Sequence, residues 1–188
     1  RERFALDAYY LGASEDAETA FARSRAAHFG HGLRSLPQWV ETIQRGAPDV
    51  LIYPEIGMDP MALKLASLRL AAVQATAWGH PETSGLPTLD HFLSAEDMEP
   101  PGAQEHYSEN LVALPHLGGC VESRGVEPES PAFASFGIDP GVPLLVCPGV
   151  PFKYAPQHDW IFPEFAARLG RCRLVFFAYG AHGLSEKL

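Results

Sequence analysis

Short apolar segments alternate with segments of helical periodicity along most of this chain, and this alternation is the strongest constraint on its fold. Brief apolar runs bounded by turn residues are typical of buried strands in parallel sheets. We predict such strands at residues 4–12, 49–54, 73–78, 90–94, 111–114, 143–147 and 172–179. Because helical segments separate many of them, the pattern favours an α/β fold, a parallel sheet with helices on both faces.

Local start signals predict where the intervening helices begin. Ser35 can cap a helix that has Pro37 in its first turn, with Trp39 and Ile43 facing inward. Asp59 directly precedes Pro60, and a carboxylate cap followed by proline is a strong helix start. Further helical segments are predicted at residues 16–29 and 157–169, with a short helical turn at residues 103–107.

The regular pattern stops between residues 116 and 141, where glycines and prolines interrupt any periodic spacing. We therefore predict a first domain at residues 1–118, a linker at 119–141 and the start of a second domain at 142–188. The last segment holds a single βαβ unit, which cannot close a two-sided sheet alone. We expect the chain to be part of a longer protein, cut inside its second domain.

Composition limits the possible partners. The chain has 188 residues, a formal net charge of −9 and a pI near 5.3, which argues against broad binding to nucleic acids or anionic membranes. Its 3 cysteines are too few for a disulfide framework, and no apolar run approaches the roughly 20 residues that cross a bilayer. We expect a cytoplasmic protein with no nucleic-acid or membrane partner.

A polar loop follows the strand predicted at residues 73–78. Residues 78–85 have the sequence Trp-Gly-His-Pro-Glu-Thr-Ser-Gly, which places an imidazole and two hydroxyls between glycines. α/β proteins bind ligands at the carboxyl ends of parallel strands, so we predict a ligand site here. His80 can donate to a sugar or phosphate oxygen or accept a proton, or it can be a loop histidine bonded to nearby backbone. Thr83, Ser84 and Gly85 can supply donors to an anion, or make an ordinary turn.

This loop and the segments around it resemble glycosyltransferase family 41, which includes O-GlcNAc transferases, SPINDLY-type enzymes and bacterial N-glucosyltransferases. The landmarks occur in the family's order: DVLIYPEIGM (49–58), LRLAAVQ (68–74), the 78–85 loop, LSAED (93–97), YSE (107–109), LVALP (111–115) and FK (152–153). The resemblance covers most of the chain.

The loop is intermediate between two branches of that family. The O-GlcNAc branch has Gly-Tyr-Pro-Gly-Thr-Ser-Gly here, and the N-glucosyltransferase branch has Gly-His-Pro-Ala-Thr-Thr-His. This chain shares His80 with the second branch and Gly85 with the first. A role specific to the second histidine of that branch therefore does not carry over.

The resemblance implies two Rossmann-like domains of the glycosyltransferase B type, facing across a cleft, with the second domain truncated. It implies transfer of GlcNAc or a hexose from a UDP-sugar to a protein or peptide side chain, with inversion and without a metal ion or other cofactor. Further parts of the family's nucleotide site and its proposed catalytic histidine fall outside these residues, so we expect the fragment alone to be inactive.

By the same resemblance, Lys153 contacts the nucleotide diphosphate and stabilises the leaving group, while His80 lines the cleft near the sugar. A solvated surface lysine is the alternative for Lys153. The glutamine that O-GlcNAc transferases carry three residues earlier is Val150 here. Substrate contacts are also assigned to Pro81, Thr83, Ser84, Gly85, Glu55, Gly57 and Phe152. Glu55 can equally be a solvated carboxylate, and Gly57 is expected to have a positive φ.

Other chemistries find little support in the sequence. His28 and His31 are three residues apart, yet no Cys or carboxylate cluster completes a metal site. No Gly-x-Gly-x-x-Gly, Walker loop or Gly-x-Ser-x-Gly elbow is present. Two alternatives stay open: a UDP-sugar epimerase of the same architecture, whose acid–base carboxylates we cannot place, and a non-catalytic interaction module.

Overall fold

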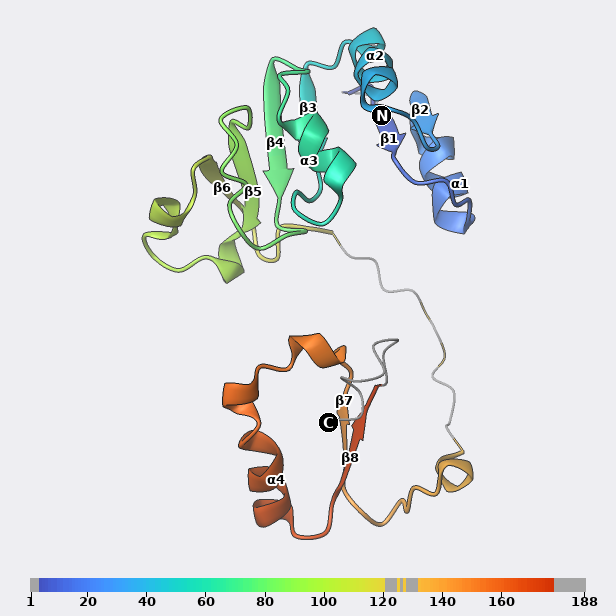
Figure 1. Cartoon of the computed structure of the whole chain (residues 1–188), viewed down its shortest axis with the longest axis vertical. Helices are drawn as coiled ribbons and strands as arrows, with labels where there is room; N and C mark the ends of the chain where they lie inside the picture. The colour runs from blue at the N-terminus through green and yellow to red at the C-terminus, as the bar shows by residue number, and fades with distance from the viewer. Residues whose placement is uncertain (1–3, 121–124, 126, 128–131, 178–188) are drawn as a thin grey trace. The chain divides into compact units, whose positions relative to one another are not determined.

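The computed structural model describes residues 4–120, 125, 127 and 132–177, and the chain forms two compact units, Arg1–Ser123 and Arg124–Leu188 (Figure 1). Strands of the first unit are β1 (Asp7–Tyr10), β2 (His28–His31), β3 (Val50–Tyr53), β4 (Val73–Ala77), β5 (His91–Ala95) and β6 (Asn110–Leu114). Its helices are α1 (Ala17–Arg25), α2 (Leu36–Gly46) and α3 (Pro60–Ala66), with 3-10 turns at Glu96–Met98 and Ala103–His106.

The described strands of this unit form two parallel sheets. A four-stranded sheet has the order β3-β4-β5-β6, and β1 pairs with β2 in a separate two-stranded sheet. Every pairing in both sheets is parallel, with Tyr53 opposite Thr76 and Thr76 opposite Phe92 in the larger one. The predicted α/β class with parallel pairing is therefore confirmed.

One face of β3 packs against α2 and α3, and this contact forms the core. Trp39 and Ile43 of α2 and Leu65 of α3 are 1%, 2% and 1% exposed and contact the strand residues Leu51 and Tyr53. On the opposite face, Val50 and Ile52 are 53% and 51% exposed. The described helices thus cover one face of this strand, whereas the sequence predicted cover on both.

Both predicted cap signals start helices. The Asp59 carboxylate accepts the N–H groups of Met61 and Ala62, at 2.7 and 2.8 Å, and Pro60 stands in the first turn. At α2, the side-chain oxygen of Gln38 accepts the Ser35 N–H at 2.9 Å. These bonds satisfy N–H groups that have no partner within the helix.

The helix predicted at residues 16–29 is confirmed up to Arg25 and is wrong in its last four residues. α1 ends at Arg25, Ala26 is extended, and His28–His31 forms β2 beside β1. None of the residues of α1 is buried, so a longer helix would have little packing to stabilise it. The segment after it instead gains a parallel ladder, and its Gly30 packs closely against Tyr9 and Trp39.

The second unit contains a βαβ arrangement of β7 (Leu144–Cys147), α4 (Ile161–Leu169) and β8 (Arg173–Phe176), with β7 and β8 parallel. Short 3-10 turns lie at Phe133–Phe136, Pro151–Lys153 and Pro156–His158. α4 starts four residues later than the predicted residue 157, since Pro163 is tolerated in a first turn but not in a helix interior. Residues 178 and 179 of the last predicted strand lie outside the described residues.

Edge-to-face aromatic contacts form the centre of this unit. The Tyr154 ring lies 6.3 Å from Phe162 and 5.7 Å from Phe176, and the latter two rings lie 5.0 Å apart. Phe162 comes from the helix and Phe176 from β8, so the cluster joins α4 to the sheet. Among the helices the structure describes, in either unit, none is long and apolar enough to span a bilayer.

Candidate functional site

The loops that follow the strands of the four-stranded sheet approach each other closely at its carboxyl edge. A Cβ at Gly79 would collide with the carbonyl oxygen of Pro54, which follows β3. A Cβ at Gly118, after β6, would lie 3.1 Å from both Ser94 O and Trp78 Nε1. Glycine at these positions therefore lets the loops after β3, β4 and β6 pack at one edge, where parallel sheets bind ligands.

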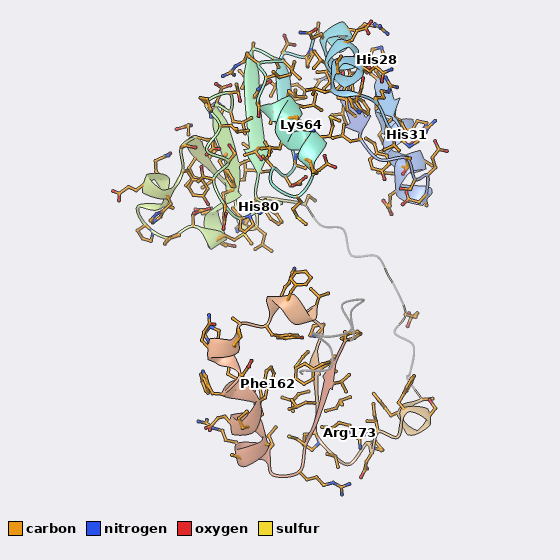
Figure 2. All side chains as sticks on the ribbon, viewed as in Figure 1. His28, His31, Lys64, His80, Phe162 and Arg173 are labelled. Carbon is orange, nitrogen blue, oxygen red and sulfur yellow. The ribbon has the colours of Figure 1, made fainter. Side chains whose placement is uncertain are left out.

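His80 lies at this edge (Figure 2), and its ring packs against Gly57. Gly57 has φ +130°, as predicted, and a Cβ there would lie 3.2 Å from the ring atoms Cδ2 and Nε2. His80 is half-buried, and its ring nitrogens make no hydrogen bond to any residue that the structure describes. The imidazole is thus available to a ligand as donor or acceptor.

Glu55, also predicted here, supports the turn that carries Gly57. Its carboxylate accepts the Met58 N–H at 2.9 Å, and its Cβ lies 3.0 Å from the position of a Cβ on Gly79. The side chain is half-buried. The structure therefore brings Glu55, Gly57 and His80 together at the ends of β3 and β4.

Further along the His80 loop, Thr83 and Ser84 form hydrogen bonds to Glu109 in the segment before β6. Thr83 Oγ1 donates to a Glu109 carboxylate oxygen at 2.6 Å, and the Ser84 N–H donates to the other oxygen at 2.9 Å. Ser84 Oγ also donates to Glu109. Pro81 and Gly85 are exposed, and Gly85 has φ +66° with open space around it. Both predicted hydroxyl donors thus already have a carboxylate acceptor within the protein.

Glu109, in the segment just before β6, is a residue that the sequence did not identify as part of the candidate site. Only 2% of it is exposed. Burial raises the pKa of its carboxyl, but hydrogen bonds from Ser84 and Thr83 outweigh burial and hold the pKa below its usual value. The sequence signal was the Tyr-Ser-Glu segment just before β6, which marks position but does not show that its carboxylate reaches a loop 25 residues earlier.

Lys153 and Phe152 belong to the second unit, in the 3-10 turn Pro151–Lys153 after β7. Both are exposed, and the Lys153 ammonium has no hydrogen bond or ion pair with the part of the chain that the structure describes. The neighbouring Tyr154 hydroxyl bonds to the carbonyls of Cys147 and Gly149, at 2.8 and 3.0 Å. Tyr154 therefore ties the turn that bears Lys153 to the carboxyl end of β7, a support that the sequence did not reveal.

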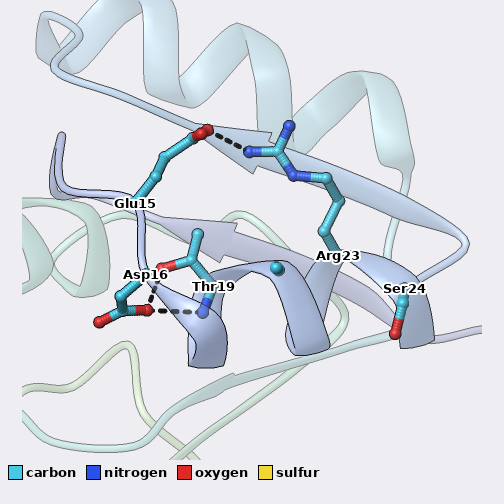
Figure 3. Close-up of a pocket in the computed structure, with 6 residues that line it drawn as sticks. Glu15, Asp16, Thr19, Arg23 and Ser24 are labelled. Carbon is cyan, nitrogen blue, oxygen red and sulfur yellow. Dashed lines mark hydrogen bonds and ion pairs between the residues drawn. The ribbon is translucent and has the colours of Figure 1, made fainter.

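Two surface pockets lie away from these residues. One, of about 370 Å³, is lined by Glu15, Asp16, Thr19, Ala20, Arg23 and Ser24 at α1. Figure 3 shows that its polar groups bond to one another, with Arg23 2.5 Å from Glu15 and Thr19 bonded to Asp16. The other, of about 690 Å³, is lined by Phe136, Ile138 and β8. Within the described ranges, no group of three potential metal ligands occurs.

Comparisons with known proteins confirm the resemblance to glycosyltransferase family 41. The chain is 37% identical over 82 residues to a probable UDP-N-acetylglucosamine–peptide N-acetylglucosaminyltransferase SPINDLY of Petunia hybrida, covering 40% of this chain and 9% of the relative. It is 29% identical over 118 residues to a UDP-glucose:protein N-beta-glucosyltransferase of Actinobacillus pleuropneumoniae serotype 5b, covering 58% and 19%. No protein-family model matches the chain.

Among solved structures, a mutant of the Thermobaculum terrenum O-GlcNAc transferase matches 96% of this chain and 34% of its own, with a TM-score of 0.77 and 22% identity. This likeness shows a shared fold. The chain spans 9% and 19% of the two curated relatives just described, so it corresponds to a small part of each.

Proposed function

We propose that this chain is part of a UDP-sugar-dependent glycosyltransferase that modifies protein side chains. The observation that carries the proposal is the position of His80, an unbonded imidazole at the carboxyl edge of a parallel sheet, in a chain similar to two kinds of protein glycosyltransferase. GlcNAc or a hexose is the sugar transferred, with inversion and without a metal ion. The names of the relatives support the sugar classes, and the family resemblance supports the stereochemistry.

Each unit has its own part in this proposal. The first unit is the acceptor-side Rossmann-like domain and the second begins the nucleotide-sugar domain of a glycosyltransferase of the B type. His80 acts on the acceptor or the sugar, with Glu55, Gly57, Pro81, Thr83, Ser84 and Gly85 shaping the surface around it. Lys153, supported by the Tyr154 turn, neutralises charge that develops on the departing diphosphate, with Phe152 beside it.

No observation favours the epimerase alternative. An epimerase of this architecture needs carboxylates that move protons, and Glu55 and Glu109 are already engaged within the first unit. Glu109 accepts hydrogen bonds at both oxygens, which stabilises its ionised form, and Glu55 accepts the Met58 N–H. The proposed protein is cytoplasmic, which its three free cysteines support.

The test is a transfer assay with the full-length gene product. UDP-GlcNAc and UDP-glucose are supplied separately with a mixture of Ser/Thr- and Asn-containing peptides, and peptide mass is followed. A mass gain of one sugar residue with stoichiometric UDP release is the expected result. Interconversion of the donor sugar without peptide modification indicates an epimerase, and peptide binding without UDP release indicates an interaction module. Either result contradicts the proposal.

A further inference from the structure

The Glu109 carboxylate is almost completely buried and accepts hydrogen bonds from two segments, the His80 loop and the segment before β6. Its Oε2 accepts Thr83 Oγ1 at 2.6 Å and Ser108 Oγ at 3.1 Å, while its Oε1 accepts both the N–H and the hydroxyl of Ser84. Thr83 Oγ1 in turn accepts the Ser108 N–H at 3.1 Å. A single side chain thus fixes two consecutive residues of the His80 loop to the segment before β6.

Neutral hydrogen-bond donors, namely hydroxyl groups and a backbone N–H, stabilise this carboxylate. Among the described residues, no Lys, Arg or His forms an ion pair with Glu109. A buried charge without a cation is stable only if its lone pairs are filled, so the hydroxyls and the N–H must keep their positions. Hydrogen bonds to an ionised acceptor are also stronger and shorter than neutral ones. The network therefore restrains Thr83 and Ser84 more firmly than an ordinary turn would.

The restraint is close enough to act on His80. Only Pro81 and Glu82 separate His80 from Thr83, and proline fixes its own φ. On its other side, the His80 ring rests against Gly57. The imidazole is consequently held between a packing contact and the Glu109 network.

We propose that Glu109 is a positioning residue for glycosyl transfer, which sets the place of His80 by clamping Thr83 and Ser84. This inference rests on the proposed function. Only 2% of Glu109 is exposed, so we expect its replacement to act by displacing the imidazole and not by removing a direct contact with the substrate. A displacement of about 1 Å at a reacting group can cost a hundredfold in rate, so the effect of losing the clamp is measurable.

Glu109→Gln in the full-length gene product is the main variant, because Gln keeps the shape but replaces one acceptor oxygen with a donor. The matched control is Glu99→Gln. Glu99 is a half-buried carboxylate of the first unit that, like Glu109, accepts hydrogen bonds from two hydroxyls, here those of Ser94 and Tyr107, but no bond joins it to the described residues of the His80 loop. Ser108→Ala, which removes one exposed donor and leaves the charge in place, serves if Glu109→Gln does not fold.

Two readouts are needed. Hydrogen exchange at the Ser84 amide reports the clamp directly, and we expect it to accelerate at least tenfold in Glu109→Gln and to stay unchanged in Glu99→Gln. In the transfer assay, we expect kcat to fall roughly tenfold to a hundredfold in Glu109→Gln while the KM for the UDP-sugar changes little. Ser108→Ala should shift both readouts in the same direction, by less.

The two readouts separate the two proposals. Unchanged exchange at Ser84 in Glu109→Gln would show that the clamp does not exist. Accelerated exchange with unchanged kcat would show that the clamp is structural and does not position His80. A wild-type protein that transfers no sugar would overturn the proposed function, and the exchange result would still decide whether Glu109 fixes the loop.

Discussion

At the scale of single residues, the polar side chains predicted to take part in the reaction divide into those with protein partners and those without. Thr83, Ser84 and Glu55 use their polar atoms within the first unit. Within the described residues, the His80 ring and the Lys153 ammonium have no such partner. Groups that are not satisfied internally keep their full capacity for a ligand, so these two are the residues on which substitution should affect the reaction most directly.

Replacing Lys153 with Ala should lower kcat of the full-length protein roughly a hundredfold or more, by analogy with the loss of one preorganised electrostatic donor. The ammonium stabilises charge that is greatest on the departing diphosphate, so the loss belongs mainly to kcat. Lys64→Ala is the control, because Lys64 is also an exposed lysine at the end of a short helical segment. Steady-state kinetics with both UDP-sugars measure the effect, and unchanged kcat and kcat/KM would identify Lys153 as a solvated surface residue.

Replacing His80 with Ala should also lower kcat, and the pH profile distinguishes its roles. A proton-transferring imidazole contributes about a hundredfold or more, and its loss removes one limb of the pH–rate curve. An imidazole that only orients the substrate costs less and leaves the curve intact. His106→Ala, an exposed histidine in the turn Ala103–His106, is the control. If both variants retain full kcat, His80 is only a loop residue.

At the scale of elements, the sequence predicted what depends on neighbouring residues. The Asp59 and Ser35 helix starts and the positive φ of Gly57 follow from local chemistry, and the structure has all three. β2 was missed because its first two residues were assigned to the helix predicted at residues 16–29, and the segment becomes a strand only by pairing with β1. Glu109 was missed because its function depends on contacts with Thr83 and Ser84, which no local spacing specifies.

The roles assigned to His80 and Lys153 came from the family resemblance. Only the structure reveals what surrounds these two residues. The His80 ring contacts Gly57, and hydrogen bonds of Tyr154 support the turn that carries Lys153. The periodicity of apolar residues in the sequence predicts where strands end, but it does not predict which loop glycines pack closely against another segment of backbone. Gly79, which packs on Pro54, is an example.

The turn after β3 gives a prediction at this scale. Gly57→Ala places a side chain at φ +130°, which costs about 1 to 3 kcal/mol, and pushes the new Cβ against the His80 ring. Both the unfolding free energy and kcat should fall. Gly102→Ala is the matched control, because Gly102 has φ +83° but no atom within 4 Å of a new Cβ. It should lower stability by denaturant unfolding and leave kcat unchanged; equal kcat losses in the two variants would contradict a specific Gly57–His80 contact.

At the scale of the whole molecule, the buried core residues and the carboxylates with lowered pKa both lie in the first unit, among the residues that the structure describes. Hydrogen bonds from Thr19 lower the pKa of Asp16, and the Arg69 hydrogen bond lowers that of Asp90. Glu109 is the buried member of this set. A carboxyl whose pKa is lower in the folded chain stabilises the fold above its unfolded pKa, and this stabilisation is lost as the pH falls through the folded value. Stability of the first unit should therefore decline in acid.

Comparing the wild-type chain with Glu109→Gln isolates the contribution of Glu109 to this decline. Above about pH 5, the wild type has an ionised carboxylate with all its donors, whereas Gln offers one acceptor oxygen, so the wild type should have the higher Tm. As the pH falls below about 4.3, Glu109 of the unfolded wild-type chain is protonated first, because the pKa of this carboxyl is lower in the folded chain, and the advantage of the charged form is progressively lost. The Tm difference should then shrink, while Asp16 and Asp90 titrate equally in both chains and cancel. Thermal unfolding from pH 7 to pH 3 measures it. A difference that stays constant across this range would mean that the pKa of Glu109 is the same in the folded and unfolded chains, so that the hydrogen bonds from Thr83 and Ser84 do not favour its charged form.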